Sequence, residues 1–137
     1  MADASLVLYE NAPADRIVTI TVNRPDKMNS LNVGVLDGLD AAFARARTDP
    51  ACGVVILTGA GPKAFVAGAD IGELAALDVL GGTAKARRGQ ACLRGIETLG
   101  KPVIAMVNGY AFGGGMEIAL ACHFRTLAET AKVGLPE

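Results

Sequence analysis

The stretch 101-KPVIAMVNGYAFGGGMEIALAC-122 joins two patterns of different structural meaning. Residues 101–109 form a short, β-branched apolar run, which is typical of a strand buried on both faces. From about Met116 onward the apolar run indicates a helix, and a run of three glycines precedes it. We therefore expect a strand, a glycine turn and a helix that carries one carboxylate, Glu117, at its start.

This glycine turn can have a chemical purpose. The first N–H groups of a helix have no partner within the helix, and glycine lets a ligand approach the backbone closely. Such donors stabilise an oxyanion, each by about 3 kcal/mol, and a carboxylate beside that oxygen can move protons. The alternative is that the glycines permit tight helix–strand packing and that Glu117 complements the helix dipole. The motif by itself leaves both interpretations open.

A second turn of the same kind follows another apolar run, at residues 53–61, which indicates a second buried strand. Here Gly68-Ala69-Asp70 leads into a predicted helix over 70–80, with Asp70 as a candidate N-cap. If the strands at 53–61 and 101–109 are parallel neighbours, both sets of free N–H groups lie at the same end of the sheet. Two donors can then converge on one ligand, although an ordinary strand–helix connection fits the spacing as well.

The rest of the chain alternates strands with helices, which predicts one α/β domain. Asn32 is a candidate N-cap for the first helix. Gly81-Gly82 interrupts the helical pattern and predicts a loop. The expected elements are a hairpin of strands 6–10 and 16–23, helices over 32–50, 70–80 and 84–100, and short strands at 124–129 and 131–135.

Composition excludes several classes of protein. The 137 residues carry a net charge of −1, and Arg87-Arg88 is the longest basic cluster, so we expect neither a nucleic-acid nor a membrane partner. The N-terminal residues lack a signal-peptide pattern, and no apolar run reaches the roughly 20 residues of a membrane span. We therefore expect a cytoplasmic protein. Its three cysteines fit reduced core thiols, and one histidine, His123, argues against a metal site.

Four stretches of the sequence, in this order, resemble the signature stretches of the enoyl-CoA hydratase/isomerase, or crotonase, family. This resemblance covers nearly the whole chain. It implies an α/β fold in which repeated β-β-α units wind into a spiral, and an assembly of trimers that often pair into hexamers. The stretches are 23-NRPDKMNSLN-32, 63-KAFVAGADIGEL-74, 101-KPVIAMVNGYAFGGGMEIALAC-122 and 128-AETAKVGLPE-137.

The resemblance also implies site residues. The N–H groups of Ala69 and Gly114 correspond to the oxyanion hole for an acyl-CoA thioester, and Glu117 and Glu137 correspond to the paired catalytic acids. We assign Glu117 as base and Glu137 as acid, although two carboxylates that share one water titrate as a coupled pair.

A third set of positions matches the family's groove for coenzyme A, which is part of the substrate and not a separate cofactor. Arg24 is a looser candidate for this set. The matched positions are Lys27, Met28, Ala67, Gly68, Ala69, Asp70 and Ile71, together with Gly114.

The predicted function is hydration of a 2-enoyl-CoA thioester to a 3-hydroxyacyl-CoA. An enoyl-CoA delta isomerase, which needs one of the two carboxylates, or another acyl-CoA enzyme of the crotonase family is the alternative within the family. A non-catalytic subunit that binds CoA thioesters is the alternative from another class. Family chains continue well past the second glutamate into a helical C-terminal region, so residues 1–137 correspond to a crotonase-type core without that region.

Overall fold

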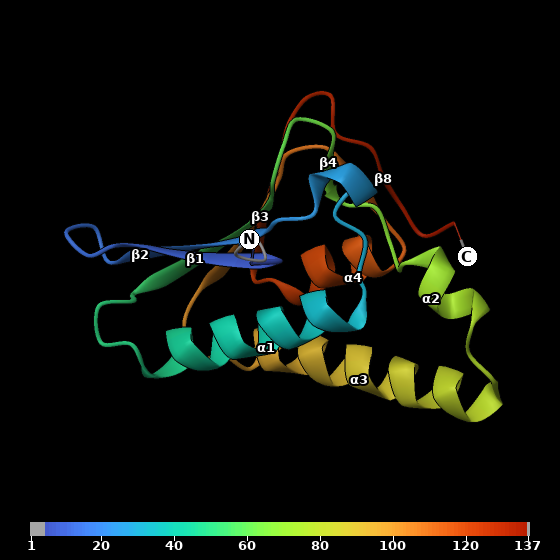
Figure 1. Cartoon of the computed structure of the whole chain (residues 1–137). Helices are drawn as coiled ribbons and strands as arrows, with labels where there is room; N and C mark the ends of the chain where they lie inside the picture. The colour runs from blue at the N-terminus through green and yellow to red at the C-terminus, as the bar shows by residue number, and fades with distance from the viewer. Residues whose placement is uncertain (1–4, 137) are drawn as a thin grey trace.

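The computed structural model describes residues 5–136, and its main element is a five-stranded sheet (Figure 1). The strand order is β1-β2-β3-β5-β7. The first two strands are antiparallel, as the predicted hairpin requires, and every later neighbour is parallel. The strands are β1 (Val7–Ala12), β2 (Ile17–Val22), β3 (Val54–Gly59), β5 (Val103–Val107) and β7 (Phe124–Leu127).

A second, smaller sheet contains three parallel strands in the order β4-β6-β8. Each of its strands follows a strand of the large sheet in the sequence, so the chain turns a corner between the two sheets three times. Helices follow the first two corners. This arrangement is the predicted spiral of β-β-α units. The strands are β4 (Ala64–Val66), β6 (Tyr110–Phe112) and β8 (Val133–Gly134).

Helices cover one side of this framework. In Figure 1 the helices α1 and α3 run side by side below the large sheet, and α4 lies between α3 and the small sheet. Arg88 of α3 forms ion pairs with Asp37 and Asp40 of α1, which fixes the two long helices against each other. The helical segments are η1 (Pro25–Lys27), α1 (Val33–Thr48), α2 (Ile71–Ala75), α3 (Val79–Glu97) and α4 (Gly114–Ala121).

The structure corrects three details of the predicted elements. Gly81 and Gly82 lie inside α3 and not in a loop, because Asp78 caps this helix by accepting the Gly81 N–H at 2.7 Å. Helix α4 begins at Gly114 and not at Met116. Strands β3 and β5 are fully buried on one face only; Ile56 and Ile104 on the other face are half-buried, and Met106 of β5 is 42% exposed.

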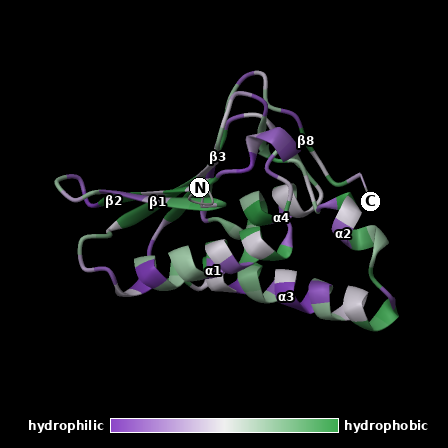
Figure 2. Ribbon diagram, viewed as in Figure 1, coloured by the Kyte–Doolittle hydropathy of each residue, from purple (hydrophilic) through white to green (hydrophobic). Residues whose placement is uncertain are grey.

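The core lies between the large sheet and the helices. Hydrophobic residues alternate with hydrophilic ones along α1 and α3, as Figure 2 shows, so each helix presents an apolar face inward. All three cysteines are buried and unpaired, which confirms the prediction of reduced core thiols. Burial raises the pKa of Cys92 and of Cys122 to about 12, so both thiols stay protonated and pack as small apolar groups.

Helix α4 approaches strand β4 more closely than any side chain allows. A Cβ added to Gly115 would lie 1.9 Å from the carbonyl oxygen of Val66, and Gly115 is buried. Only the absence of a side chain permits this contact between helix and strand. Gly115 therefore fixes the position of the whole N-terminal turn of α4.

We predict that Gly115→Ala destabilises the fold by about 1–3 kcal/mol, because the backbone of β4 must move to admit the methyl group. Urea unfolding measures this change as a lower midpoint. Gly95→Ala is the matched control, since nothing lies within 4 Å of a Cβ added to Gly95 in α3. The control should gain about 0.5–1 kcal/mol from helix propensity. Equal midpoints for the two variants would contradict this explanation.

Candidate active site

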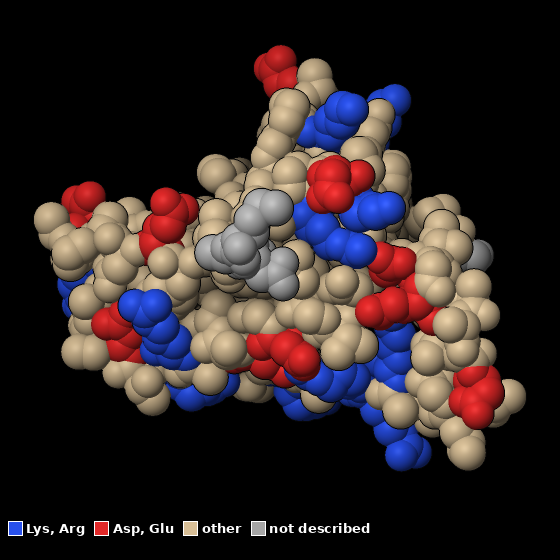
Figure 3. All heavy atoms as spheres, in the orientation of Figure 1, with Lys and Arg blue, Asp and Glu red and all other residues tan. Residues whose placement is uncertain are grey.

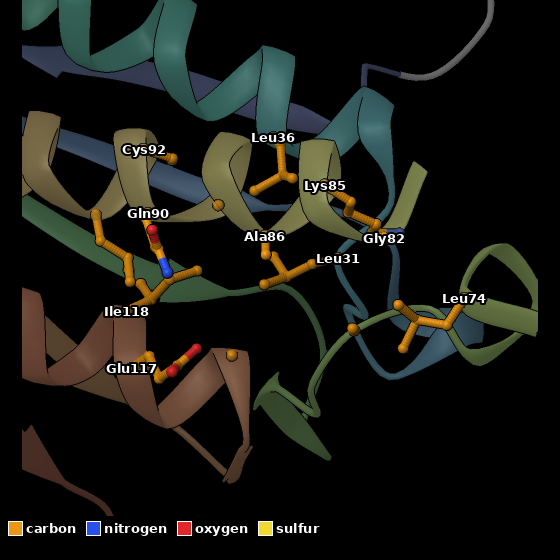
Figure 4. A pocket seen from close by; sticks show the side chains of 14 residues that line it. Leu31, Leu36, Leu74, Gly82, Lys85, Ala86, Gln90, Cys92, Glu117 and Ile118 are labelled. Carbon is orange, nitrogen blue, oxygen red and sulfur yellow. The ribbon is translucent and has the colours of Figure 1, made fainter. Parts of the chain in front are cut away.

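A cavity of about 460 Å³ lies between α3, α4 and the segment that follows β4. Its walls are mostly apolar, with Lys85, Gln90 and Glu117 as the residues with long polar side chains. Figure 4 shows Glu117 of α4 and Gln90 of α3 pointing into the space between their helices. The lining residues are Leu31, Leu36, Ala69, Leu74, Gly82, Lys85, Ala86, Gly89, Gln90, Cys92, Leu93, Gly114, Glu117 and Ile118. Three residues predicted for the catalytic site, Ala69, Gly114 and Glu117, therefore share one cavity.

The backbone at Ala69 is held by a parallel bridge to Leu31. The Leu31 N–H donates to the carbonyl of Gly68 at 2.8 Å, and the Asp70 N–H donates to the carbonyl of Leu31 at 2.8 Å. In this pattern the N–H of Ala69 points away from the Leu31 backbone. Within residues 5–136 no acceptor takes that N–H, and Ala69 lines the cavity. The N–H of Ala69 is therefore free to bind a ligand.

Gly114 supplies a second donor of the same kind. It is the first residue of α4, so its N–H has no partner within the helix. A Cβ added to Gly114 would lie 3.9 Å from Oε2 of Glu117. The carboxylate of Glu117 thus lies beside the free end of α4, where a proton donor or acceptor can reach a bound oxyanion.

Arg24 fixes the residue next to Ala69. Its Nη1 atom donates to Oδ2 of Asp70 at 2.6 Å, and the same nitrogen donates to the hydroxyl and the carbonyl of Ser30. Asp70 in turn accepts the Glu73 N–H through Oδ1, which caps α2 as predicted. The hydrogen bond from Arg24 holds the pKa of the Asp70 carboxyl below its usual range. Arg24 is therefore bound within the protein, and its ion pair orders the segment that carries the Ala69 N–H.

We predict that Arg24→Met lowers the melting temperature at pH 7, and that this difference disappears in acid. The lowered pKa of Asp70 means that the stabilisation is present above the unfolded-state pKa of about 3.9 and is lost as the pH falls through the folded-state pKa. Thermal unfolding of the wild type and of Arg24→Met between pH 7 and pH 2.5 measures this difference in melting temperature. Arg94→Met, which removes an exposed cation of α3, is the control. A difference that stays constant over this pH range would contradict the role of the ion pair.

Two of the segments predicted to bind coenzyme A lie next to each other. The Ala67 N–H donates to the carbonyl of Met28 at 3.1 Å, so the loop after η1 runs beside the segment after β4. Lys27 is exposed at the end of η1, and Ile71 is 79% exposed at the start of α2. The other predicted catalytic acid, Glu137, lies outside the described residues.

Helix α3 contributes cavity residues that the sequence analysis did not single out. Lys85 donates to Oε2 of Glu73 at 2.5 Å, and the same carboxylate accepts the N–H of Val33 at the start of α1. This contact ties α1, α2 and α3 together at the cavity. It also lowers the pKa of the Glu73 carboxyl through the hydrogen bond from Lys85. The spacing of Gly82, Ala86 and Gly89 along one helical face is the sequence signal that could have indicated this wall.

A charged binding surface, a metal site and a membrane span each place requirements on the described residues. Figure 3 shows basic and acidic side chains interspersed over the visible face. Among residues 5–136 no cluster of three or more His, Cys, Asp or Glu side chains has the geometry to hold a metal ion. The helices of the same residues are each too short or too polar to cross a membrane.

A two-sheet spiral in which Ala69, Gly114 and Glu117 line one cavity is the crotonase-type fold that the sequence resemblance predicts, and comparison with known proteins agrees. The family model described as Enoyl-CoA hydratase/isomerase matches residues 13–137. The short-chain-enoyl-CoA hydratase of Clostridium acetobutylicum is 43% identical over 89% of this chain and 47% of its own length. The crotonyl-CoA hydratase of Syntrophomonas wolfei is 42% identical over 94% of this chain and 51% of its own length.

Solved structures show the same relationship. An enoyl-CoA hydratase from Bacillus anthracis superposes with a TM-score of 0.90 at 38% identity, over 95% of this chain and 50% of that chain. The chain spans about half the length of the relatives that it matches. It belongs to the enoyl-CoA hydratase/isomerase family.

Proposed function

We propose that the protein is an enoyl-CoA hydratase, which adds water across the 2,3 double bond of a 2-enoyl-CoA thioester. The observation that carries this proposal is the meeting of two free backbone donors and one glutamate in a single cavity. The family membership and the hydratase names of the relatives support the same reaction. An acyl-CoA thioester is accordingly the proposed substrate, and coenzyme A enters as part of it.

The backbone donors would act on the thioester carbonyl. When water attacks Cβ of the enoyl group, negative charge develops on the carbonyl oxygen, and the N–H groups of Ala69 and Gly114 stabilise it there. Preorganised donors of this kind are worth about 2.7–4 kcal/mol each in the transition state. The parallel bridge between Leu31 and Ala69 and the start of α4 hold both groups in place before the substrate binds.

The two glutamates would move the protons. Glu117 takes a proton from the attacking water, so the water oxygen bonds to Cβ, and Glu137 gives a proton to Cα, so the double bond is lost. The sum of these steps adds one water molecule to the substrate. Glu117 lies beside Gly114, the proposed donor, which supports its place next to the reacting carbons.

Coenzyme A would lie along Ala67 to Ile71, with Lys27 close to a phosphate. The contact between Met28 and Ala67 supports this groove, because it brings the two matched segments together.

We also propose that the enzyme is cytoplasmic and that it works as a homotrimer or hexamer. The exposed apolar side chains Phe124 and Leu127 of β7 support burial against further protein surface.

The decisive test is hydration of crotonyl-CoA, followed as the loss of absorbance of the conjugated thioester, in the complete polypeptide that contains residues 1–137. We predict that Glu117→Gln and Glu137→Gln each lower turnover by about a hundred- to ten-thousandfold, because the amide cannot exchange protons. Binding of a saturated acyl-CoA should stay nearly unchanged. Glu10→Gln, at an exposed site on β1, is the matched control and should keep full turnover.

Assays of the wild-type protein on both substrates separate the alternatives. If the wild-type protein does not hydrate crotonyl-CoA but moves the double bond of a 3-enoyl-CoA, the protein is an isomerase and the hydratase proposal is wrong. If the wild-type protein binds acyl-CoA thioesters and converts neither substrate, it is a non-catalytic binding subunit.

We predict that Lys27→Ala weakens the binding of CoA thioesters and reduces its dependence on salt, because an exposed cation near a phosphate is screened by ions. Titration calorimetry at low and high salt measures both effects. Arg94→Ala removes the same charge from an exposed position on α3 and serves as the control. Equal affinity for wild type and Lys27→Ala at low salt would place the phosphates elsewhere.

A further inference from the structure

Glycines Gly82 and Gly89 of α3 have no packing reason to be glycine. Nothing lies within 4 Å of a Cβ added at either position. Both residues line the cavity that contains Glu117. By contrast, backbone atoms exclude a side chain at Gly59 and Gly115, at distances of 2.3 and 1.9 Å. The space beside Gly82 and Gly89 is therefore unfilled volume of the cavity.

Glycine at these positions also weakens the helix. Within a helix it costs about 0.5–1 kcal/mol relative to alanine, and α3 contains both residues in its interior. Gly95 of α3 has equally open surroundings but does not line the cavity. A substitution at Gly95 therefore changes the helix propensity of α3 without filling the cavity, and it serves as the control.

The cavity wall around these glycines is long and mostly apolar. Gly82 and Gly89 are seven residues apart, which is about 10 Å along a helix. A crotonyl group has only three carbon–carbon bonds, one of them double, and therefore spans less than about 4.5 Å. The neighbouring wall consists of apolar side chains such as Leu93 and Ile118, which favour a hydrocarbon ligand. Lys85, which lies between the two glycines and also lines the cavity, is paired with Glu73.

We propose that Gly82 and Gly89 are specificity-determining residues, and that the space beside them admits acyl chains longer than crotonyl. This inference rests on the proposed function, since it places the acyl group in the cavity of Glu117. It goes further by naming the substrate class as 2-enoyl-CoA thioesters with an extended hydrocarbon chain. A larger side chain at either position would occupy the volume that the distal carbons need.

The test measures kcat/KM for trans-2-enoyl-CoA thioesters of four and twelve carbons in the complete polypeptide that contains residues 1–137. The variants are Gly82→Leu and Gly89→Leu, with Gly95→Leu as the matched control. We expect the twelve-to-four-carbon ratio to fall at least tenfold in the first two variants, which corresponds to about 1.4 kcal/mol. In the control, the twelve-to-four-carbon ratio should stay within about twofold of wild type, which is well below the tenfold fall expected for the cavity variants.

Two further measurements keep the test decisive. Gly89→Ala and Gly95→Ala should both melt at a higher temperature than wild type, and only Gly89→Ala should lower the ratio, so a Leu variant that does not fold leaves the inference testable. Affinities for butyryl-CoA and dodecanoyl-CoA report on the cavity without catalysis. If no enoyl-CoA is hydrated but the Gly89 variants still bind dodecanoyl-CoA more weakly relative to butyryl-CoA, the proposed hydratase function is wrong. The inference that Gly89 makes room for long acyl chains is then still supported. Unchanged length profiles in every cavity variant would overturn the inference.

Discussion

The structure depends on how the backbone is paired where it leaves the large sheet for the small one. Towards the corner between β3 and β4, the pairing of β3 with β5 ends at Leu57 and Ala105, and two asparagine amides take over. Asn29, which is fully buried, donates to the carbonyl of Ala64 at 2.8 Å. Asn108, in the next corner along the chain, donates to the carbonyl of Gly59 at 2.9 Å and accepts the Gly59 N–H at 3.1 Å. Each buried backbone group left unpaired would cost about 1–3 kcal/mol, so these side chains hold successive turns of the spiral together.

The candidate site follows from these corners. Strands β4 and β6 pair in parallel in the small sheet, with Ala64 opposite Tyr110. The backbone segments that follow them therefore emerge at the same end of that sheet, where Ala69 and Gly114 line one cavity. Neither N–H is special by itself. Their combination depends on the corners, which set how far each strand extends before the chain enters its next segment.

The sequence predicts those parts of the fold whose cause is local. The hairpin, the strands at 53–61 and 101–109 and the caps of α1 and α2 follow from periodicity and from turn residues, and the structure contains all of them. The loop that the sequence predicts at Gly81-Gly82 is wrong, because the Asp78 cap and the packing of α3 against α1 override the weak helix propensity of glycine. Pairings between distant residues, such as Arg24 with Asp70, leave no local pattern, so the sequence could not show what orders the Ala69 segment.

The three glycines that precede Met116 have different surroundings, which bears on the question that the sequence left open between packing and chemistry. Gly113 adopts a φ of 50°, a backbone conformation that favours glycine, and turns the chain into α4. Gly115 is needed for packing, since a Cβ there would meet the Val66 carbonyl. At Gly114 an added Cβ would lie 3.0 Å from Cδ1 of Leu31, a side chain of the cavity wall, so the absence of a side chain keeps that part of the cavity open. Packing and the proposed ligand binding are therefore compatible interpretations: Gly113 and Gly115 place the start of α4, and this placement brings Gly114 to the wall of the cavity.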